Sequence, residues 1–347
     1  MVIIVAFVLL AWWRFARGKP KADAPPPVEP PPPAEPKPEP SPALTPELHP
    51  RRAVGLMTAA YATFALWTFY AWYRAHKPLS KYKFGGDGWM DVTTYAGGAD
   101  KCGHAWATMA LARLGTYILT SVGGFNRLKS SVVSAVMSEL CFVGVEVRDG
   151  FFYEFSFSDL TGDSVGMGLA VLLDNFPKLR ELFAYRVEYF PSRAYARKVA
   201  GTSPCPLGGC SRWNIAEDYS GQTYLAAFHL AGIPVIRNKL GKAARFVDVA
   251  IEFDSRNYKP PPDPDIAGKV RQDLFFGLSI NAQGISDTIF ENRTSPAARR
   301  AKTILHGLFE VFNLPLGSQR LFGTSRSGPP RPMLPPKPKR PLLPPAT

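Results

Sequence analysis

The stretch of sequence that decides the fold runs from residue 100 to residue 166. It begins with DKCGH at residues 100–104, continues through two apolar segments, and ends with EVRD at residues 146–149 and SFSDLTGDSVG at residues 156–166. Residues three or four positions apart lie on one face of a helix, so the stretch predicts three helical pairs of polar side chains. The pairs are Asp100 with His104, Glu146 with Asp149, and Asp159 with Asp163.

The segments between these pairs, residues 105–121 and 130–145, are strongly apolar. Carboxylates at the ends of apolar helices are costly unless they are paired or hydrated. We therefore expect the polar residues to interact. Three alternatives stay open: they cap helices and hydrogen-bond one another, they form a metal, catalytic or polar-ligand site, or they contact a partner.

The connections between the predicted helices indicate where the pairs meet. If helices over residues 101–121, 130–147 and 158–175 stack antiparallel through short turns, all three pairs gather at one end of a bundle. Asp100, Glu146, Asp149 and Asp159 then lie at that end, with His104 and Asp163 one turn inside it. The hypothesis is one shared polar pocket around His104.

As a catalytic site, this pocket would use His104 as a base or ligand and the acidic residues as ligands, acids or orienting groups. The candidate catalytic residues are Asp100, His104, Glu146, Asp149, Ser156, Asp159 and Asp163, and the candidate metal ligands are His104, Glu146, Asp149 and Asp159. A histidine with several carboxylates suits a hard or borderline divalent metal, which is the cofactor predicted here. Ser156 lacks the G-x-S-x-G pattern, so serine hydrolysis is disfavoured.

Three motifs follow one another in a fixed order. D-K-x-x-H comes first, two apolar segments follow, of which the second ends in E-x-x-D, and S-x-x-D-L-x-x-D-x-x-G comes last. This order resembles that of the YfiM-like periplasmic lipoproteins, a family of unknown function. Residues 71–73 and 218–224 are similar to segments of its longer members, so the resemblance extends over residues 53–322. The VanZ-like membrane proteins have a comparable layout of these motifs. The resemblance implies a cell-envelope protein and supplies no reaction.

Proline content predicts the domain organisation. Residues 14–52 and 326–347 hold most of the 35 prolines, and we expect them to form a Pro-rich linker and a basic Pro-rich tail without a packed core. Residues 1–13 are interpreted as a short hydrophobic anchor or signal remnant, residues 53–185 as a helical bundle, and residues 186–325 as a strand-containing region. The expected fold class is α+β, with a membrane-associated antiparallel helical bundle, a smaller region of amphipathic strands and a helix, and disordered arms.

Residues 53–73 form an uncharged apolar run that is long enough to cross a bilayer. Trp67, Tyr70, Trp72 and Tyr73 gather near its C-terminal end, as aromatic residues do at a membrane interface. We therefore expect this run to anchor the protein. The expected location is the cell envelope, at the inner membrane or its periplasmic face.

From residue 186 onward the pattern changes from a helical to a strand period. Apolar and polar residues alternate over residues 245–254 and 273–281, which indicates half-buried strands. Residues 297–312 predict an amphipathic helix. We expect a disulfide between Cys205 and Cys210 in an oxidising compartment, and reduced thiols at Cys102 and Cys141.

The formal net charge of +13 lies partly in the proline-rich arms. No basic helix or aromatic-basic motif occurs between the arms, so no nucleic-acid partner is expected. The expected partners are the membrane and an envelope lipid or cell-wall polymer, and the oligomeric state stays open. The predicted function is that of a bacterial cell-envelope, membrane-associated protein with a structural or ligand-binding or lipid-binding role. The alternative is a membrane-associated, metal-dependent hydrolase of an envelope lipid or cell-wall precursor.

Overall fold

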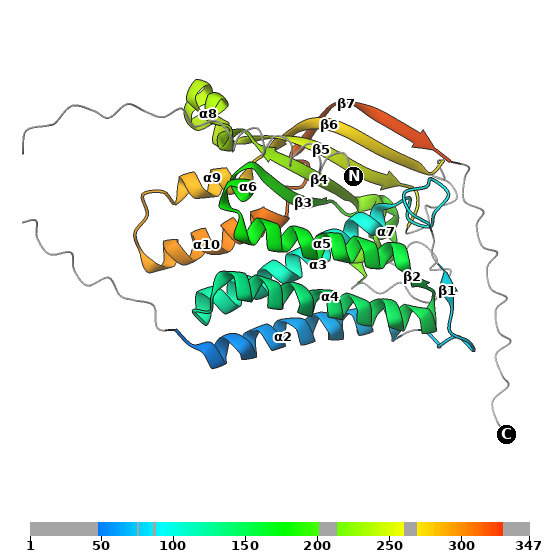
Figure 1. The fold of residues 1–347 in the computed structure, drawn as a ribbon. Coiled ribbons are helices and arrows are strands. Elements are labelled where there is room, and N and C mark those ends of the chain that lie inside the picture. Colours follow the sequence, from blue (N-terminus) through cyan, green and yellow to red (C-terminus); the bar gives the residue numbers. More distant parts are fainter. Residues whose placement is uncertain (1–47, 75, 86–87, 201–213, 260–268, 329–347) are drawn as a thin grey trace, which may run out of the picture. The chain divides into compact units, whose positions relative to one another are not determined.

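The structure is a computed structural model and describes residues 48–74, 76–85, 88–200, 214–259 and 269–328. These residues form a group of long helices that packs against an antiparallel sheet (Figure 1). The expectations for residues 1–47, for most of the C-terminal tail and for the disulfide between Cys205 and Cys210 lie outside the described residues.

The first described helix, α2, spans Pro50–Thr68 and continues as a π-helical turn, η1, over Phe69–Tyr73. Pro50 lies in the first turn of α2. A backbone N–H has no acceptor within the helix at that position, so proline, which lacks this N–H, loses no helical hydrogen bond there. The apolar run over residues 53–73 is therefore one continuous helical segment. Two segments, Pro50–Tyr73 and Arg127–Phe152, are long and apolar enough to cross a membrane, by length and composition alone.

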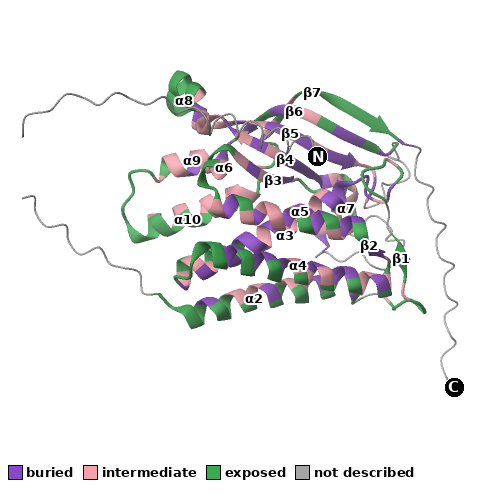
Figure 2. Ribbon diagram, in the orientation of Figure 1, coloured by how far each residue is buried: buried purple, intermediate pink, exposed green. Residues whose placement is uncertain are grey.

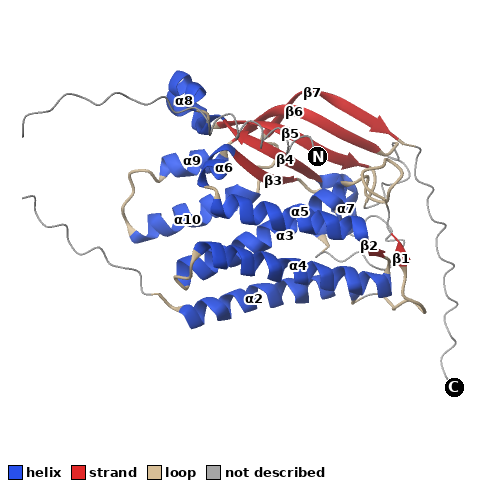
Figure 3. Ribbon diagram, in the orientation of Figure 1, coloured by secondary structure: helices blue, strands red, loops and turns tan. Residues whose placement is uncertain are grey.

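The three helices predicted around the motif are observed as α3 (Ala99–Tyr117), α4 (Arg127–Phe152) and α5 (Phe157–Asn175). A π-helical turn, η2 (Ile118–Val122), extends α3. Asn126 accepts a hydrogen bond from the backbone N–H of Lys129 at the start of α4, and Ser156 accepts one from Asp159 at the start of α5. These caps begin each helix directly after a short turn, so consecutive helices run antiparallel and side by side (Figure 3).

Glycines allow α5 to lie against α3 at backbone distance. A Cβ atom at Gly162 would stand 2.9 Å from the carbonyl oxygen of Lys101, and one at Gly166 would stand 2.2 Å from that of Ala105. A side chain at Gly166 would therefore push the helices apart. Their close approach brings the acidic residues of α5 within reach of His104 on α3.

The sheet is a five-stranded antiparallel meander in which the strands lie in chain order. The strands are β3 (Phe183–Tyr189), β4 (Gln222–His229), β5 (Val247–Arg256), β6 (Arg271–Ile280) and β7 (Ser318–Ser327). The predicted strands over residues 245–254 and 273–281 correspond to β5 and β6. A separate short parallel pair, β1 (Phe84–Gly85) with β2 (Phe155–Ser156), lies beside the start of α5.

Shorter helices connect these elements. They are α6 (Pro177–Leu182), η3 (Ile215–Glu217), η4 (Tyr219–Gly221), α7 (Arg193–Val199), η5 (Leu230–Gly232), α8 (Pro234–Leu240), η6 (Gly241–Arg245) and α9 (Ala282–Ile289). The amphipathic helix predicted over residues 297–312 is α10, which spans Pro296–Val311. It returns the chain from β6 to β7 along the outer edge of β3, where Phe312 bridges to Val187.

The completely buried side of β5 is its polar side (Figure 2). Asp248, Glu252 and Asp254 have no exposed surface, whereas Val249, Ile251 and Phe253 on the other side of the strand are only partly buried. The sequence correctly predicts that apolar and polar residues alternate. The more deeply buried side, however, is the one that carries the carboxylates, because these have charged partners. Nη1 of Arg186 lies 2.7 Å from Oδ2 of Asp248, for example.

One apolar core joins the sheet to the helices. Its buried members are Ala96, Ala99, Val187, Tyr219 and Tyr224, and Tyr95, Cys102, Trp106, Tyr185 and Phe253 pack against them. These residues come from both the bundle and the strand-containing region. The sheet therefore supports α3, the helix that carries the DKCGH motif.

Candidate functional site

The imidazole of His104 lies where α3, α4 and α5 meet. Its Nδ1 stands 3.0 Å from Oδ1 of Asp163 on α5. Its Nε2 stands 3.9 Å from Oε1 of Glu146 on α4 and 4.0 Å from Oδ2 of Asp159 on α5. The structure thus brings these four predicted site residues together around one ring.

Lys101 completes the cluster, and sequence reasoning did not place it there. Its Nζ lies 2.6 Å from Oδ2 of Asp100 and 2.8 Å from Oδ1 of Asp159, and its side chain is buried. Burial alone would lower the pKa of Lys101, but the two carboxylates raise it above its usual value, so the amine stays protonated. The available signal was its position directly after Asp100, at the start of a helix that is mostly apolar.

Hydrogen bonds from neighbouring residues orient the carboxylates of Asp163 and Glu146. Oγ1 of Thr108 donates to Oδ1 of Asp163 over 2.8 Å, and the backbone N–H of Ser156 donates to Oε2 of Glu146 over 3.1 Å. The hydroxyl of Ser156 lies 2.9 Å from that of Ser158 and also caps α5. Ser156, a candidate catalytic residue, is thus engaged in capping and in holding Glu146.

Asp149 lies beside this cluster and has a different partner. The hydroxyl of Tyr73 donates to Oδ1 of Asp149 over 2.6 Å, which ties η1 to the end of α4. Among the described residues, the group whose ligand atoms lie within 4.8 Å of one another is His104, Glu146 and Asp163. It shares His104 and Glu146 with the predicted metal ligands and contains Asp163 in place of Asp149 and Asp159.

The cluster carries more acidic than basic groups. Its acidic members are Asp100, Glu146, Asp159 and Asp163, and its basic members are Lys101 and His104. All six side chains are largely or fully buried. Burial would lower the pKa of His104, but Asp163, Asp159 and Glu146 outweigh it and raise this pKa well above its usual value. Burial also raises the pKa of Glu146 to about 8. The site therefore retains protons or attracts cations.

Two buried oxygens reinforce that conclusion. Oε1 of Glu146 and Oδ2 of Asp163 have no hydrogen-bond partner among the described residues. An unsatisfied carboxylate oxygen in a protein interior is costly, so each oxygen favours a hydrogen-bond donor or a metal ion as a partner. The side chain of His104 is 18% exposed and that of Glu146 is 1% exposed. This limited opening suits an ion better than a bulky substrate.

A family model described as "Predicted periplasmic lipoprotein (DUF2279)" matches residues 86–175. No curated protein and no solved structure matches the chain. The matched segment contains α3, α4 and α5 and every residue of the cluster, whereas the five-stranded sheet lies beyond it. The match fits an envelope-associated protein of unknown activity, and the YfiM-like and VanZ-like resemblances remain predictions.

Proposed function

We propose that this chain is a membrane-associated envelope protein whose helical bundle binds a divalent cation through His104, Glu146 and Asp163. The observation that carries this proposal is the convergence of three ligand atoms, one from each of three helices, to within 4.8 Å of one another. One imidazole and two carboxylates favour a borderline or hard cation such as Zn²⁺ or Mn²⁺. A cation there would tie α3, α4 and α5 together.

The surrounding residues fit this role. Lys101 pairs with both Asp100 and Asp159, and its single positive charge offsets one of their two negative charges. Coordination would satisfy the unpartnered oxygens Oε1 of Glu146 and Oδ2 of Asp163. Thr108 holds Asp163 from outside the group, as hydrogen bonds to metal ligands commonly do.

A proton on His104 and a bound cation are alternatives, because a coordinated imidazole nitrogen cannot carry a proton. In the absence of metal, the protonated ring pairs with Asp163 and locks α3 to α5. Metal binding should release this proton. Affinity for the metal should therefore rise as pH rises.

Hydrolysis by the same residues is the second candidate function, and it requires that a substrate can reach the site. A substrate of envelope lipid or cell-wall size would have to reach His104, and the ring of Phe142 packs edge-on against it at a centroid distance of 5.8 Å. Cation binding requires no such opening. We therefore place cation binding ahead of catalysis.

Thermal unfolding with Zn²⁺, Mn²⁺ or a chelator tests the proposal. A ligand at about 100 times its Kd stabilises a folded protein by about 2.7 kcal/mol, so the wild type should melt several degrees higher with the preferred metal. His104→Gln should abolish this response, and elemental analysis should find no bound metal.

His306→Gln is the matched control, because His306 also lies between carboxylates. Its Nδ1 stands 3.0 Å from Oδ2 of Asp287, and its Nε2 stands 3.5 Å from Oε1 of Glu310. This variant should keep the metal response of the wild type. A response that survives in His104→Gln, or is missing in the wild type, would rule out the proposed site.

The proposed membrane contact rests on the outward sides of α2 and α4. The exposed large apolar residues there include Val54, Leu56, Leu66 and Phe69 on α2 and η1, and Leu128, Val132, Val133, Val136, Met137, Leu140, Val147 and Phe151 on α4. The inward side of α4 instead carries the buried serines Ser130, Ser131, Ser134 and Ser138. Apolar exposure of this extent is typical of a surface that contacts lipid or protein, and the envelope match favours lipid.

A further inference from the structure

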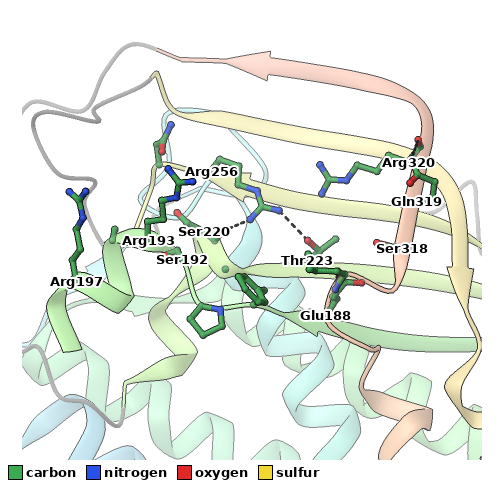
Figure 4. A pocket seen from close by; sticks show the side chains of 16 residues that line it. Glu188, Ser192, Arg193, Arg197, Ser220, Thr223, Arg256, Ser318, Gln319 and Arg320 are labelled. Carbon is green, nitrogen blue, oxygen red and sulfur yellow. Dashed lines mark hydrogen bonds between the residues drawn. The ribbon is translucent and has the colours of Figure 1, made fainter. Parts of the chain in front are cut away.

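A pocket of about 650 Å³ lies over the polar side of the sheet, far in sequence from the cation site (Figure 4). Strands β3, β4, β5 and β7 and helix α7 contribute its lining. Four arginines are among the lining residues: Arg193, Arg197, Arg256 and Arg320. Glu188 is the one acid among the described residues that line it.

Arg193 and Arg197 lie one turn apart on α7. Both are exposed, and Figure 4 shows them at the same end of the pocket, beside Arg256. Like charges four residues apart on a helix repel each other and destabilise it. An anion that contacts both side chains would reduce this repulsion.

Arg256 and Arg320 are held in position from below. Nη2 of Arg256 lies 2.7 Å from Oδ2 of Asp254, and Arg320 pairs with the same oxygen. Nε of Arg320 also stands 3.7 Å from Oε2 of Glu252, a carboxyl whose pKa burial raises. Both acids are fully buried, so they hold the two guanidinium groups in place and offset part of their charge.

The oxygens of Glu188 are held by neutral donors rather than by the arginines. Oε2 accepts a hydrogen bond from Nδ2 of Asn313 over 2.8 Å, and Oε1 accepts one from the backbone N–H of Leu316 over 3.0 Å. These bonds fix the loop that leads into β7. The pocket thus combines fixed polar walls with an excess of positive charge.

We propose that this pocket binds the phosphate group of a phosphate ester. Guanidinium groups form paired hydrogen bonds with phosphate oxygens, and a phosphate offers more charge and more acceptors than a carboxylate to a group of arginines. Pockets for small molecules commonly measure about 300 to 1,000 Å³, so the volume leaves room for the organic part of the ligand. Phe190, Pro191 and Leu316 supply apolar surface for that part.

Two measurements test the proposal: calorimetric titration with glycerol 3-phosphate, and the gain in sedimentation when phosphatidylglycerol is added to phosphatidylcholine vesicles. The gain separates headgroup binding from contact of the apolar sides of α2 and α4 with lipid. The first probe represents a soluble ester and the second a lipid headgroup. The wild type should bind at least one of them, and which one it binds identifies the source of the phosphate. Replacing both Arg193 and Arg197 by Gln should weaken that binding at least tenfold. The cation site shares none of these residues, so its failure would leave this result unaffected.

The matched control replaces Arg299 and Arg300 by Gln. These two arginines are exposed in the first turns of α10, outside the pocket lining, and their loss changes the net charge equally. The control should bind like the wild type. An equal loss in both double variants, or no binding of either probe by the wild type, would overturn the proposal.

Chemical protection provides a measurement that needs no variant. Phenylglyoxal modifies exposed arginines, and mass spectrometry can follow each position separately. Glycerol 3-phosphate should protect Arg193 and Arg197 in the wild type while Arg299 and Arg300 react at an unchanged rate. Unchanged reaction of all four positions at a saturating concentration of the bound probe would count against the pocket.

Discussion

Nδ1 of His104 on α3 lies 3.0 Å from Oδ1 of Asp163 on α5, and Thr108 donates to the same oxygen. Asp163 is fully buried, and Gly162, the residue before it, lets the backbone of α5 approach that of α3. The contact thus depends on a polar pair and on the lack of a side chain beside it. Each part can be tested separately.

Replacing His104 by Gln should lower the free energy of unfolding by about 1 to 3 kcal/mol without metal, because Asp163 loses a charged donor in a buried site. Urea unfolding at pH 6 measures this change. His76→Gln is the control, since among the described residues the side chain of His76 contacts Tyr153 at an exposed position away from the cluster. Equal stability of His104→Gln and the wild type would show that the pair contributes nothing to the bundle.

Replacing Gly166 by Ala should destabilise the fold by about 1 to 3 kcal/mol, the usual cost of forcing extra atoms into a packed interior. The added Cβ would meet the carbonyl oxygen of Ala105 at 2.2 Å, and backbone cannot move aside as a side chain can. Gly168→Ala is the matched control on the same helix, because nothing lies within 4 Å of its Cβ. That control should be neutral or stabilising by up to about 1 kcal/mol, since Ala favours helix over Gly. The reverse order of stabilities in thermal unfolding would contradict the packing of α3 against α5.

The stability contributed by His306 should disappear at alkaline pH. Hydrogen bonds to Asp287 and Glu310 raise the pKa of His306 to about 9. A histidine whose pKa is raised in the folded state stabilises the fold fully when the pH is below its pKa in the unfolded state, near 6.5. This contribution is lost as the pH rises through 9. The difference in unfolding free energy between the wild type and His306→Gln should therefore shrink between pH 6 and pH 10. A difference that stays constant over this range would mean that the imidazole charge does not stabilise the contact with α9.

Charged substitutions on the outer side of α4 should release the protein from membranes. Val136 and Leu140 are exposed one turn apart. Replacing both by Glu places two carboxylates, which are costly to transfer from water into lipid, on the proposed lipid-facing side. Carbonate extraction followed by sedimentation should show more protein in the soluble fraction than for the wild type. The control replaces Val235 and Leu240, two exposed apolar residues of α8 on the sheet side of the molecule, by Glu. If the α8 control is released equally, or the α4 variant stays in the pellet, then α4 is not the contact surface.

Much of the local structure followed from sequence patterns. The motif helices, the continuous helix over residues 53–73, strands β5 and β6, and α10 lie within a few residues of where spacing and alternation predicted them. Short turns between the helices also predicted that His104 would meet acidic residues of two later helices. These features depend on neighbouring residues, which the linear sequence displays directly.

The sequence pattern was less informative where one residue has several possible partners. Asp149 and Glu146 stand three apart on α4, yet Glu146 lies beside His104 and Asp149 bonds to Tyr73. Helical spacing gives both side chains the same general direction, but the rotation of α4 against α2 and α3 separates their partners. The same holds for Lys101, whose neutralising role becomes visible only when α5 brings Asp159 to it.

The sequence by itself determined the helices and the alternation of the strands, because each of these properties repeats over a few residues. Only the tertiary structure decided that the carboxylate side of β5 is buried, and that Arg193 and Arg320 line one pocket. Both outcomes depend on residues far apart in the chain. Burial of a charge is stable only where such a distant partner arrives, and no local pattern records which partner that will be.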